Sequence, residues 1–238
     1  TVSGLPLLAN DPHLGLETPV LWYLARIVTP ELYLTGATVP GLPVVLLGHN
    51  RFIAWGFTTT NSDVQDLFIE TIDPKDPEKY LTPQGSEKFS VRPETFKIKD
   101  APDVTVNFRA TRHGPVLSDA DDAAAKLLQD SQHVVALAFT GLGDEDTTPE
   151  ALWRLNAARN WKDFQDALQL FQTPAQNIVY ADWMGHIGFT APGLVPVRKD
   201  GDGRYPVDGA DGKHDWRGMI PFTYAPRLFD PDTGAIFN

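Results

Sequence analysis

The sequence predicts an α+β fold that is rich in strands and carries a helical pair near residues 149–172. First, the 238 residues include 20 prolines and 19 glycines, which favour many turns and short strands over a helical bundle. Second, short apolar, aromatic and β-branched runs recur along the chain between turn-forming residues. Third, apolar residues recur at helical spacing most clearly in residues 149–172.

Composition excludes several classes of function. The chain is 42% hydrophobic and 21% charged, with a net charge of −11. Such an acidic chain is a poor match for nucleic acid or an anionic membrane, which both attract cationic faces. No apolar run approaches the roughly 18 residues needed to cross a bilayer. The absence of cysteine excludes disulfides, thiolate metal sites and a cysteine nucleophile. We therefore expect neither a nucleic-acid nor a membrane partner.

The first half of the chain predicts mainly strands. We expect extended structure at 20–28 (a buried strand), 44–47, 52–60 and 67–72, with a hairpin connection at 48–51. The last of these strands leads into a polar, proline-rich stretch at 73–83. Further on, alternation predicts strands at 94–99, 104–109 and 134–139, with an exposed loop or short helix at 119–130.

The helical pair has clear start signals. Thr148 followed by Pro149 is typical of a helix beginning, and Asn160 is a good cap for a second helix. Trp161, Phe164 and Leu168 then share one face of that second helix. Beyond it, 177–181 and 186–190 flank a turn and predict a hairpin, and the tail from 199 onward is rich in loops.

The common catalytic motifs are missing from the sequence. It contains no HExxH zinc motif, no GxSxG elbow, no GxxxxGK[ST] loop and no strand-linked GxGxxG. From these residues alone, the chain is an acidic α+β domain of open function. One alternative for such a domain is a non-catalytic, β-rich module whose Trp and Phe residues form a ligand groove.

A series of short blocks changes this interpretation. In chain order they are LLANDPHLG at 7–15, PGLP at 40–43, GHN at 48–50, IAWGFT at 53–58, DVQDL at 63–67, RHGP at 112–115, AQNIVYAD at 175–182, GDGRYP at 201–206, DWRG at 215–218, IPF at 220–222 and TGAI at 233–236. Together they resemble the large subunit of the penicillin amidase (penicillin acylase) family over nearly the whole chain.

This resemblance implies an N-terminal-nucleophile hydrolase with a four-layer αββα fold, of which residues 1–238 are a single fragment of the large-subunit domain without a separate linker. It implies that the parent enzyme is an amide hydrolase acting on a penicillin-like or other small N-acyl compound. In this family a serine exposed as the first residue of the large subunit attacks the amide. Its own amine, with a pKa of about 8, accepts the hydroxyl proton.

Two residues correspond to catalytic positions of the family. His13 matches a helper that orients the serine and its amine, and the backbone N–H of Thr59 matches an oxyanion donor. The alternatives are that His13 stabilises a turn and that Thr59 is an ordinary strand residue. The matching acyl-pocket positions are Leu14, Leu47, Phe57 and Gln176, which could also be core residues. Because Leu14 and Leu47 are aliphatic, the acyl group need not be phenylacetyl.

The resemblance also implies a structural calcium ion and no organic cofactor. The matching ligands are Asp63, the Gln65 carbonyl, Asp66 and the Gly203 carbonyl, with further ligands supplied from outside this chain. Mixed carboxylate and carbonyl oxygens suit Ca²⁺. The alternative is that Asp63 and Asp66 are solvated turn residues.

Two expected catalytic groups fall outside the sequence. The nucleophilic serine is expected upstream of Thr1, and Thr1 itself does not fit that register. The side-chain oxyanion donor is an Asn expected just beyond residue 238, one strand position after Asn238. The expected partners are therefore the small subunit and the remainder of the large subunit, and we expect the isolated chain to be inactive. The family also implies a bacterial periplasmic or secreted location.

Overall fold

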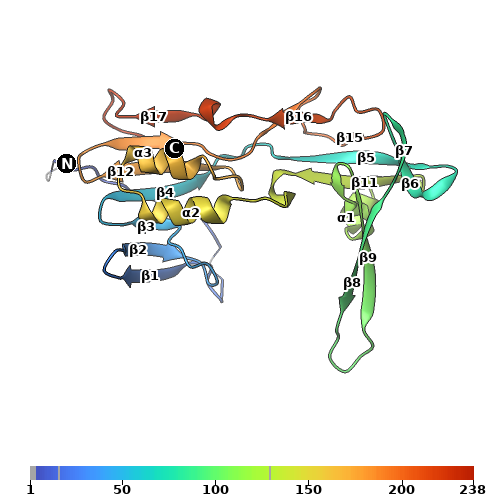
Figure 1. Cartoon of the computed structure of the whole chain (residues 1–238), viewed down its shortest axis with the longest axis horizontal. Coiled ribbons are helices and arrows are strands. Elements are labelled where there is room, and N and C mark those ends of the chain that lie inside the picture. The colour runs from blue at the N-terminus through green and yellow to red at the C-terminus, as the bar shows by residue number, and fades with distance from the viewer. Residues whose placement is uncertain (1–3, 16, 129) are drawn as a thin grey trace. The chain divides into compact units, whose positions relative to one another are not determined.

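The computed structural model describes residues 4–15, 17–128 and 130–238, and the chain divides into two compact units (Figure 1). Unit 1 comprises Thr1–Ser62, Gly143–Val195 and Ile220–Asn238, and unit 2 comprises Asp63–Leu142 and Pro196–Met219. Both units are built from separate stretches of sequence, so neither is a contiguous domain. Thr1 lies outside the described residues, and the assignment of 1–238 to one large-subunit domain stays a prediction.

Unit 1 is built on a seven-stranded sheet whose neighbouring strands are all antiparallel. Its order is β1 (Tyr23–Val28), β2 (Tyr33–Thr38), β3 (Leu47–His49), β4 (Ile53–Thr59), β12 (Gln176–Asp182), β13 (Ile187–Thr190) and β17 (Arg227–Phe229). The predicted hairpin at 177–190 is confirmed as β12 and β13. The central strand β4 lies between β3 and β12, which come from distant parts of the sequence.

The predicted helical pair is confirmed as α2 (Thr148–Ala157) and α3 (Trp161–Leu168). Pro149 lies in the first turn of α2, and the Asn160 side chain caps α3 by accepting a hydrogen bond from the Asp163 N–H. Both helices bury their apolar faces in the main core of unit 1. That core includes Leu152, Leu155, Phe164 and Leu168 of the helices and Trp55, Ile178 and Tyr180 of the central strands.

Unit 2 contains three smaller sheets. One has the order β11 (His133–Phe139), β5 (Gln65–Asp73), β6 (Asp76–Thr82) and β7 (Gly85–Lys88), with β15 (Val207–Asp208) parallel to β5. The others pair β8 (Ser90–Phe96), β9 (Val104–Thr111) and β10 (Gly114–Pro115), and β14 (Pro196–Arg198) with β16 (Trp216–Met219). The β8–β9 hairpin extends away from the rest of unit 2 (Figure 1).

The remaining helices are short. They are α1 (Asp122–Ala125), within the predicted 119–130 stretch, and three 3₁₀ turns at Leu117–Asp119, Thr140–Leu142 and Phe222–Tyr224. Across the described residues, no helix has both the length and the apolar character that crossing a membrane requires.

Several strand predictions differ from the structure. Of the strand predicted at 44–47 only Leu47 is extended, because β3 (Leu47–His49) runs into the predicted hairpin connection at 48–51. The strand predicted at 94–99 ends at Phe96. The strand predicted at 20–28 as buried forms only over Tyr23–Val28, and most of its residues are exposed because β1 is an edge strand. The polar, proline-rich stretch 73–83, for which the sequence predicts no particular structure, contains β6 and is followed by β7. Pairing with β5 and burial of Tyr80 to 2% exposure stabilise β6, and neither contact is visible in local sequence.

Candidate active site

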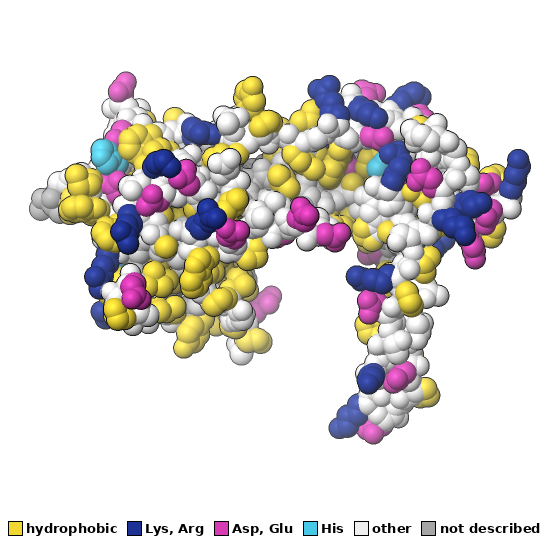
Figure 2. Space-filling model, in the orientation of Figure 1, with side chains coloured by type: hydrophobic (Ala, Val, Ile, Leu, Met, Phe, Trp, Pro, Cys, Tyr) yellow, Lys and Arg dark blue, Asp and Glu magenta, His cyan; other side chains and the backbone are white. Residues whose placement is uncertain are grey.

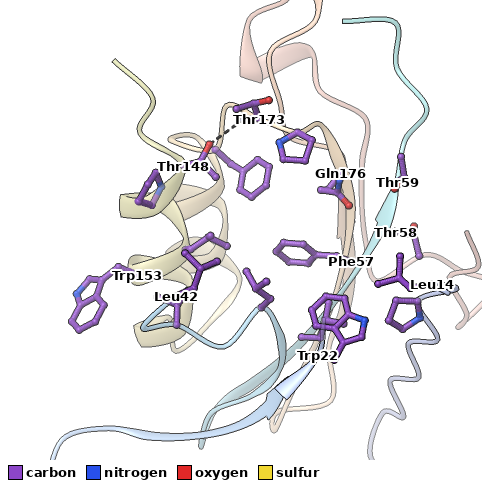
Figure 3. Close-up of a pocket in the computed structure, with 18 of the residues that line it drawn as sticks. Leu14, Trp22, Leu42, Phe57, Thr58, Thr59, Thr148, Trp153, Thr173 and Gln176 are labelled. Atoms are coloured by element: carbon purple, nitrogen blue, oxygen red, sulfur yellow. Dashed lines mark hydrogen bonds between the residues drawn. The ribbon is translucent and has the colours of Figure 1, made fainter. Parts of the chain in front are cut away.

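A cavity of about 850 Å³ lies within unit 1 (Figure 3). Its wall combines β4, α2 and three loops at 11–14, 42–46 and 171–174. Ligand pockets for small molecules are typically about 300–1,000 Å³ and mostly apolar. The size and composition of this cavity therefore suit a small organic group.

Apolar side chains form most of the wall. The Phe57 ring points from β4 into the cavity and meets Phe171 edge to face, with ring centroids 6.0 Å apart (Figure 3). Trp153 and Leu42 lie toward the α2 side, and Leu14 lies toward the end of β4 (Figure 3). The cavity therefore offers an apolar lining between α2 and the end of β4.

The structure brings all six of the predicted catalytic and acyl-pocket residues to this cavity. They are His13, Leu14, Leu47, Phe57, Thr59 and Gln176, which come from the N-terminal segment, β3, β4 and β12. Gln176 lies directly opposite Thr59 in the β12–β4 pairing. Their individual roles stay predictions.

His13 lies at the solvent-exposed rim of the cavity. Its Nδ1 is 2.8 Å from the Asp11 carbonyl oxygen, and its Nε2 is 3.9 Å from the Asp11 carboxylate. The side chain is 89% exposed. The local bond to Asp11 orients the ring, and the exposed side chain is accessible to a substrate or a neighbouring amine.

Thr59 is the last residue of β4. Its carbonyl oxygen accepts a hydrogen bond of 3.4 Å from the Asn177 side chain on β12. Strand geometry fixes the direction of the backbone N–H, which is what a backbone oxyanion donor requires. Thr59 lines the cavity, and its role as an oxyanion donor stays a prediction.

Two further polar groups at this cavity were not singled out from the sequence. Thr58 Oγ1 and Trp22 Nε1 are both buried, and neither has a hydrogen-bond partner among the described residues. Buried polar groups usually have partners, so groups without one at a cavity are candidates for contacts with a ligand. The block IAWGFT contains Thr58, but nothing in it distinguishes the hydroxyl from that of a strand residue.

The predicted calcium ligands lie in unit 2 around an arginine. Arg198 Nε is 2.8 Å from Asp66 Oδ2, and Arg198 Nη2 is 3.2 Å from Asp63 Oδ1. The Trp216 Nε1–H also donates to Asp66. Gly203 lies against Arg198 and Asp66: a Cβ atom at Gly203 would be 2.5 Å from Asp66 Oδ1. Gln65 begins β5, pairs with Phe139 of β11 and is exposed.

These described residues do not by themselves fit a calcium site. Among them there is no group of three or more His, Cys, Asp or Glu side chains that could hold a metal. The cation facing Asp63 and Asp66 is the guanidinium of Arg198, and both oxygens of Asp66 accept N–H donors. Calcium binding therefore stays a prediction that depends on ligands beyond these residues.

The RHGP and DWRG blocks meet in a buried charged network of unit 2. His113 lies between Glu70 and Asp215, at 2.7 and 3.0 Å, and stacks on Phe68 with ring centroids 3.6 Å apart. Burial disfavours the charge on Asp215, but hydrogen bonds from Arg112, His113 and Lys199 outweigh it and hold the Asp215 pKa well below its usual range. The network stabilises unit 2 and explains why the two blocks lie together.

Comparisons with known proteins show the family of this chain. The family model described as penicillin amidase matches residues 1–238. The acyl-homoserine lactone acylase QuiP of Pseudomonas aeruginosa is 34% identical over 236 residues, covering 98% of this chain and 28% of that protein. Penicillin G acylase of Escherichia coli is 31% identical over 234 residues, covering 98% of this chain and 26% of that protein.

A solved structure shows the same fold. The thermostable penicillin G acylase from Alcaligenes faecalis superposes with a TM-score of 0.78 at 28% identity, covering 91% of this chain and 38% of that chain. The chain thus spans well under half the length of these relatives. The α+β fold is therefore that of a penicillin G acylase, and the chain belongs to the penicillin amidase family.

Proposed function

We propose that the protein hydrolyses the amide bond of a small N-acyl compound and that the cavity of unit 1 binds its acyl group. The observation that carries this proposal is the convergence of His13, Thr59 and the four acyl-pocket residues on one apolar cavity. Relatives named as acyl-homoserine lactone acylase and penicillin G acylase support an N-acyl substrate.

The net reaction is addition of water to an amide, which gives a carboxylate and an amine. In the proposed mechanism, a serine at the start of the large subunit attacks the carbonyl carbon. The new C–O bond forms, the C–N bond breaks, and the serine proton passes through the α-amine to the leaving nitrogen. Water then hydrolyses the ester and restores the serine hydroxyl.

This chain supplies the surroundings of that reaction. The Thr59 N–H would donate to the carbonyl oxygen as negative charge develops there, and His13 would orient the serine and its amine. Phe57 and Leu47 would hold the acyl chain through apolar contact. The serine itself and a second oxyanion donor are expected outside residues 1–238, so we propose that this chain alone has no activity.

The remainder of the enzyme is the expected partner of unit 1. Trp153 and Leu42 line the cavity yet are 60% and 44% exposed. Figure 2 shows hydrophobic side chains gathered at the surface of unit 1 around β1, β2 and α2. We propose that other parts of the parent enzyme, including its small subunit, cover these apolar groups.

The test is a substrate panel with the full-length protein. Penicillin G, N-acyl homoserine lactones of several chain lengths and a glutaryl amide would be incubated with the enzyme, and the released amine would be quantified. Release of amine from at least one compound is the expected result. Saturable binding without product from any of them would support the alternative of a non-catalytic ligand-binding module.

A further inference from the structure

Asn10 forms a side-chain clamp on the central strand of unit 1. Its Nδ2 donates to the Phe57 carbonyl oxygen at 3.0 Å, and its Oδ1 accepts from the Phe57 N–H at 2.9 Å. A side-chain amide carries a donor and an acceptor as a peptide group does. The pairing of β3 with β4 involves Ala54 and Trp55 only, so Asn10 serves Phe57 as a neighbouring strand would.

Gly56, the residue before Phe57, leaves room for the Asn10 side chain because it has no side chain of its own. A Cβ on Gly56 would lie 2.8 Å from Asn10 Oδ1 and 2.9 Å from Asn10 Cβ. Gly56 does not have the positive φ that would require glycine for backbone reasons. The reason for glycine at this position is therefore the close approach of Asn10.

This clamp links two predicted catalytic positions. His13 follows Asn10 by three residues, and Thr59 follows Phe57 by two. The described residues 4–15 have no helix or strand of their own, and the local bond from His13 reaches only Asp11. The two hydrogen bonds of Asn10 therefore fix the segment that carries His13 and Leu14 against the strand that carries Phe57 and Thr59.

We propose that Asn10 is a positioning residue for amide hydrolysis: it sets the distance between the His13 segment and the Thr59 N–H across the cavity. This inference rests on the proposed function. Positioning of this kind has large kinetic effects, because a displacement of about 1 Å can reduce a rate roughly 100-fold.

The first test is Asn10→Asp in the full-length enzyme. At neutral pH the carboxylate keeps an acceptor for the Phe57 N–H but loses the donor to the Phe57 carbonyl, so we expect kcat to fall about tenfold or more with a smaller change in KM. A protonated carboxyl group regains an O–H donor beside a carbonyl acceptor. The ratio of variant to wild-type kcat should therefore rise as the pH is lowered toward the carboxyl pKa.

The second test is a double-mutant cycle of Asn10→Gly and Gly56→Ala, because Asn10→Ala would keep the Cβ that lies 2.9 Å from a Cβ at position 56. Alanine at position 56 should reduce kcat in the presence of Asn10, because the two side chains collide, and should have a much smaller effect once Asn10 is removed. Asn107→Ala, on an exposed position of β9, is the matched control and should leave kcat unchanged. Circular dichroism and Tm of each variant give the folded fraction for normalising the rates.

The outcomes separate the two proposals. A wild-type enzyme that releases amine while Asn10→Gly keeps full kcat and KM would overturn the positioning role alone. The positioning role would also be overturned if the ratio of Asn10→Asp to wild-type kcat did not change with pH and the effects of the substitutions at positions 10 and 56 on kcat were additive. A correctly processed wild-type enzyme that hydrolyses no N-acyl compound would overturn the proposed function and this inference with it.

Discussion

Asn156 on α2 makes with Val45 the same pair of hydrogen bonds that Asn10 makes with Phe57. Its Oδ1 accepts from the Val45 N–H at 2.7 Å, and its Nδ2 donates to the Val45 carbonyl oxygen at 2.8 Å. Asn156 is only 3% exposed, whereas the segment that carries Asn10 is largely open to solvent. The Asn156 clamp therefore fastens the loop that contributes Val44 and Leu46 to the cavity wall onto the core of unit 1.

Asn156→Ala should destabilise the full-length protein. Removing the amide leaves the N–H and carbonyl of Val45 without these partners, and each unsatisfied buried group costs about 1–3 kcal/mol. We expect the free energy of unfolding to fall by about 2–4 kcal/mol, measured by urea denaturation. A midpoint equal to that of the wild type would show that water or a local shift satisfies Val45.

Phe57→Ala should weaken the use of substrates with apolar acyl groups. Truncation removes a ring that lines the cavity and contacts Phe171, and loss of a buried Phe side chain costs about 1.5–3 kcal/mol of apolar contact. This corresponds to a decrease in kcat/KM of about 10- to 150-fold. The comparison is Phe96→Ala on the β8–β9 hairpin, where the same truncation at a half-exposed ring should not change kcat/KM. Equal kinetics for the two variants would contradict the acyl-pocket role.

Arg198→Met should destabilise unit 2 by leaving two carboxylates without their cation. Asp66 is 4% and Arg198 12% exposed at the side chain, so this ion pair is largely buried. Breaking such a pair from one side costs about 3–5 kcal/mol, while Arg198→Lys should retain part of the stability. Thermal unfolding with EDTA or CaCl₂ provides the second measurement. A higher Tm of Arg198→Met in CaCl₂ than in EDTA would show that Asp63 and Asp66 accept a divalent ion. An equal Tm in both would count against the predicted calcium site.

Asp215 should make the stability of unit 2 sensitive to acid. Because the folded-state pKa of Asp215 lies below its unfolded value of about 3.9, its contribution is complete above that value and is lost as pH falls through the folded pKa. Asp215→Asn should be less stable than the wild type near pH 7, since Arg112, His113 and Lys199 lose a charged partner. The difference between the two proteins should shrink as urea denaturation is repeated from about pH 5 down to about pH 3. If the difference in free energy of unfolding between the two proteins stayed constant across that range, Asp215 would not be a source of the acid sensitivity.

The helical pair and the family blocks could be predicted because their signals are local. Pro149 at the start of α2 and Asn160 at the cap of α3 act within one turn of helix, so neighbouring residues suffice to identify them. The turn between β12 and β13 is similarly encoded by adjacent residues. The strand β6 could not be predicted, because its pairing with β5 and the burial of Tyr80 outweigh a polar, proline-containing sequence.

By itself, the sequence determined the fold class, a helical pair near residues 149–172, and the aligned positions of His13, Thr59 and the acyl-pocket residues. Only the tertiary structure decided that these positions share one cavity, that Asn10 clamps Phe57, and that Arg198 faces Asp66 across 132 residues of sequence. The physical reason is that caps and turns depend on adjacent residues, whereas these contacts depend on how distant strands pair. Pairing of β12 with β4 brings Gln176 opposite Thr59, a contact that no local pattern encodes.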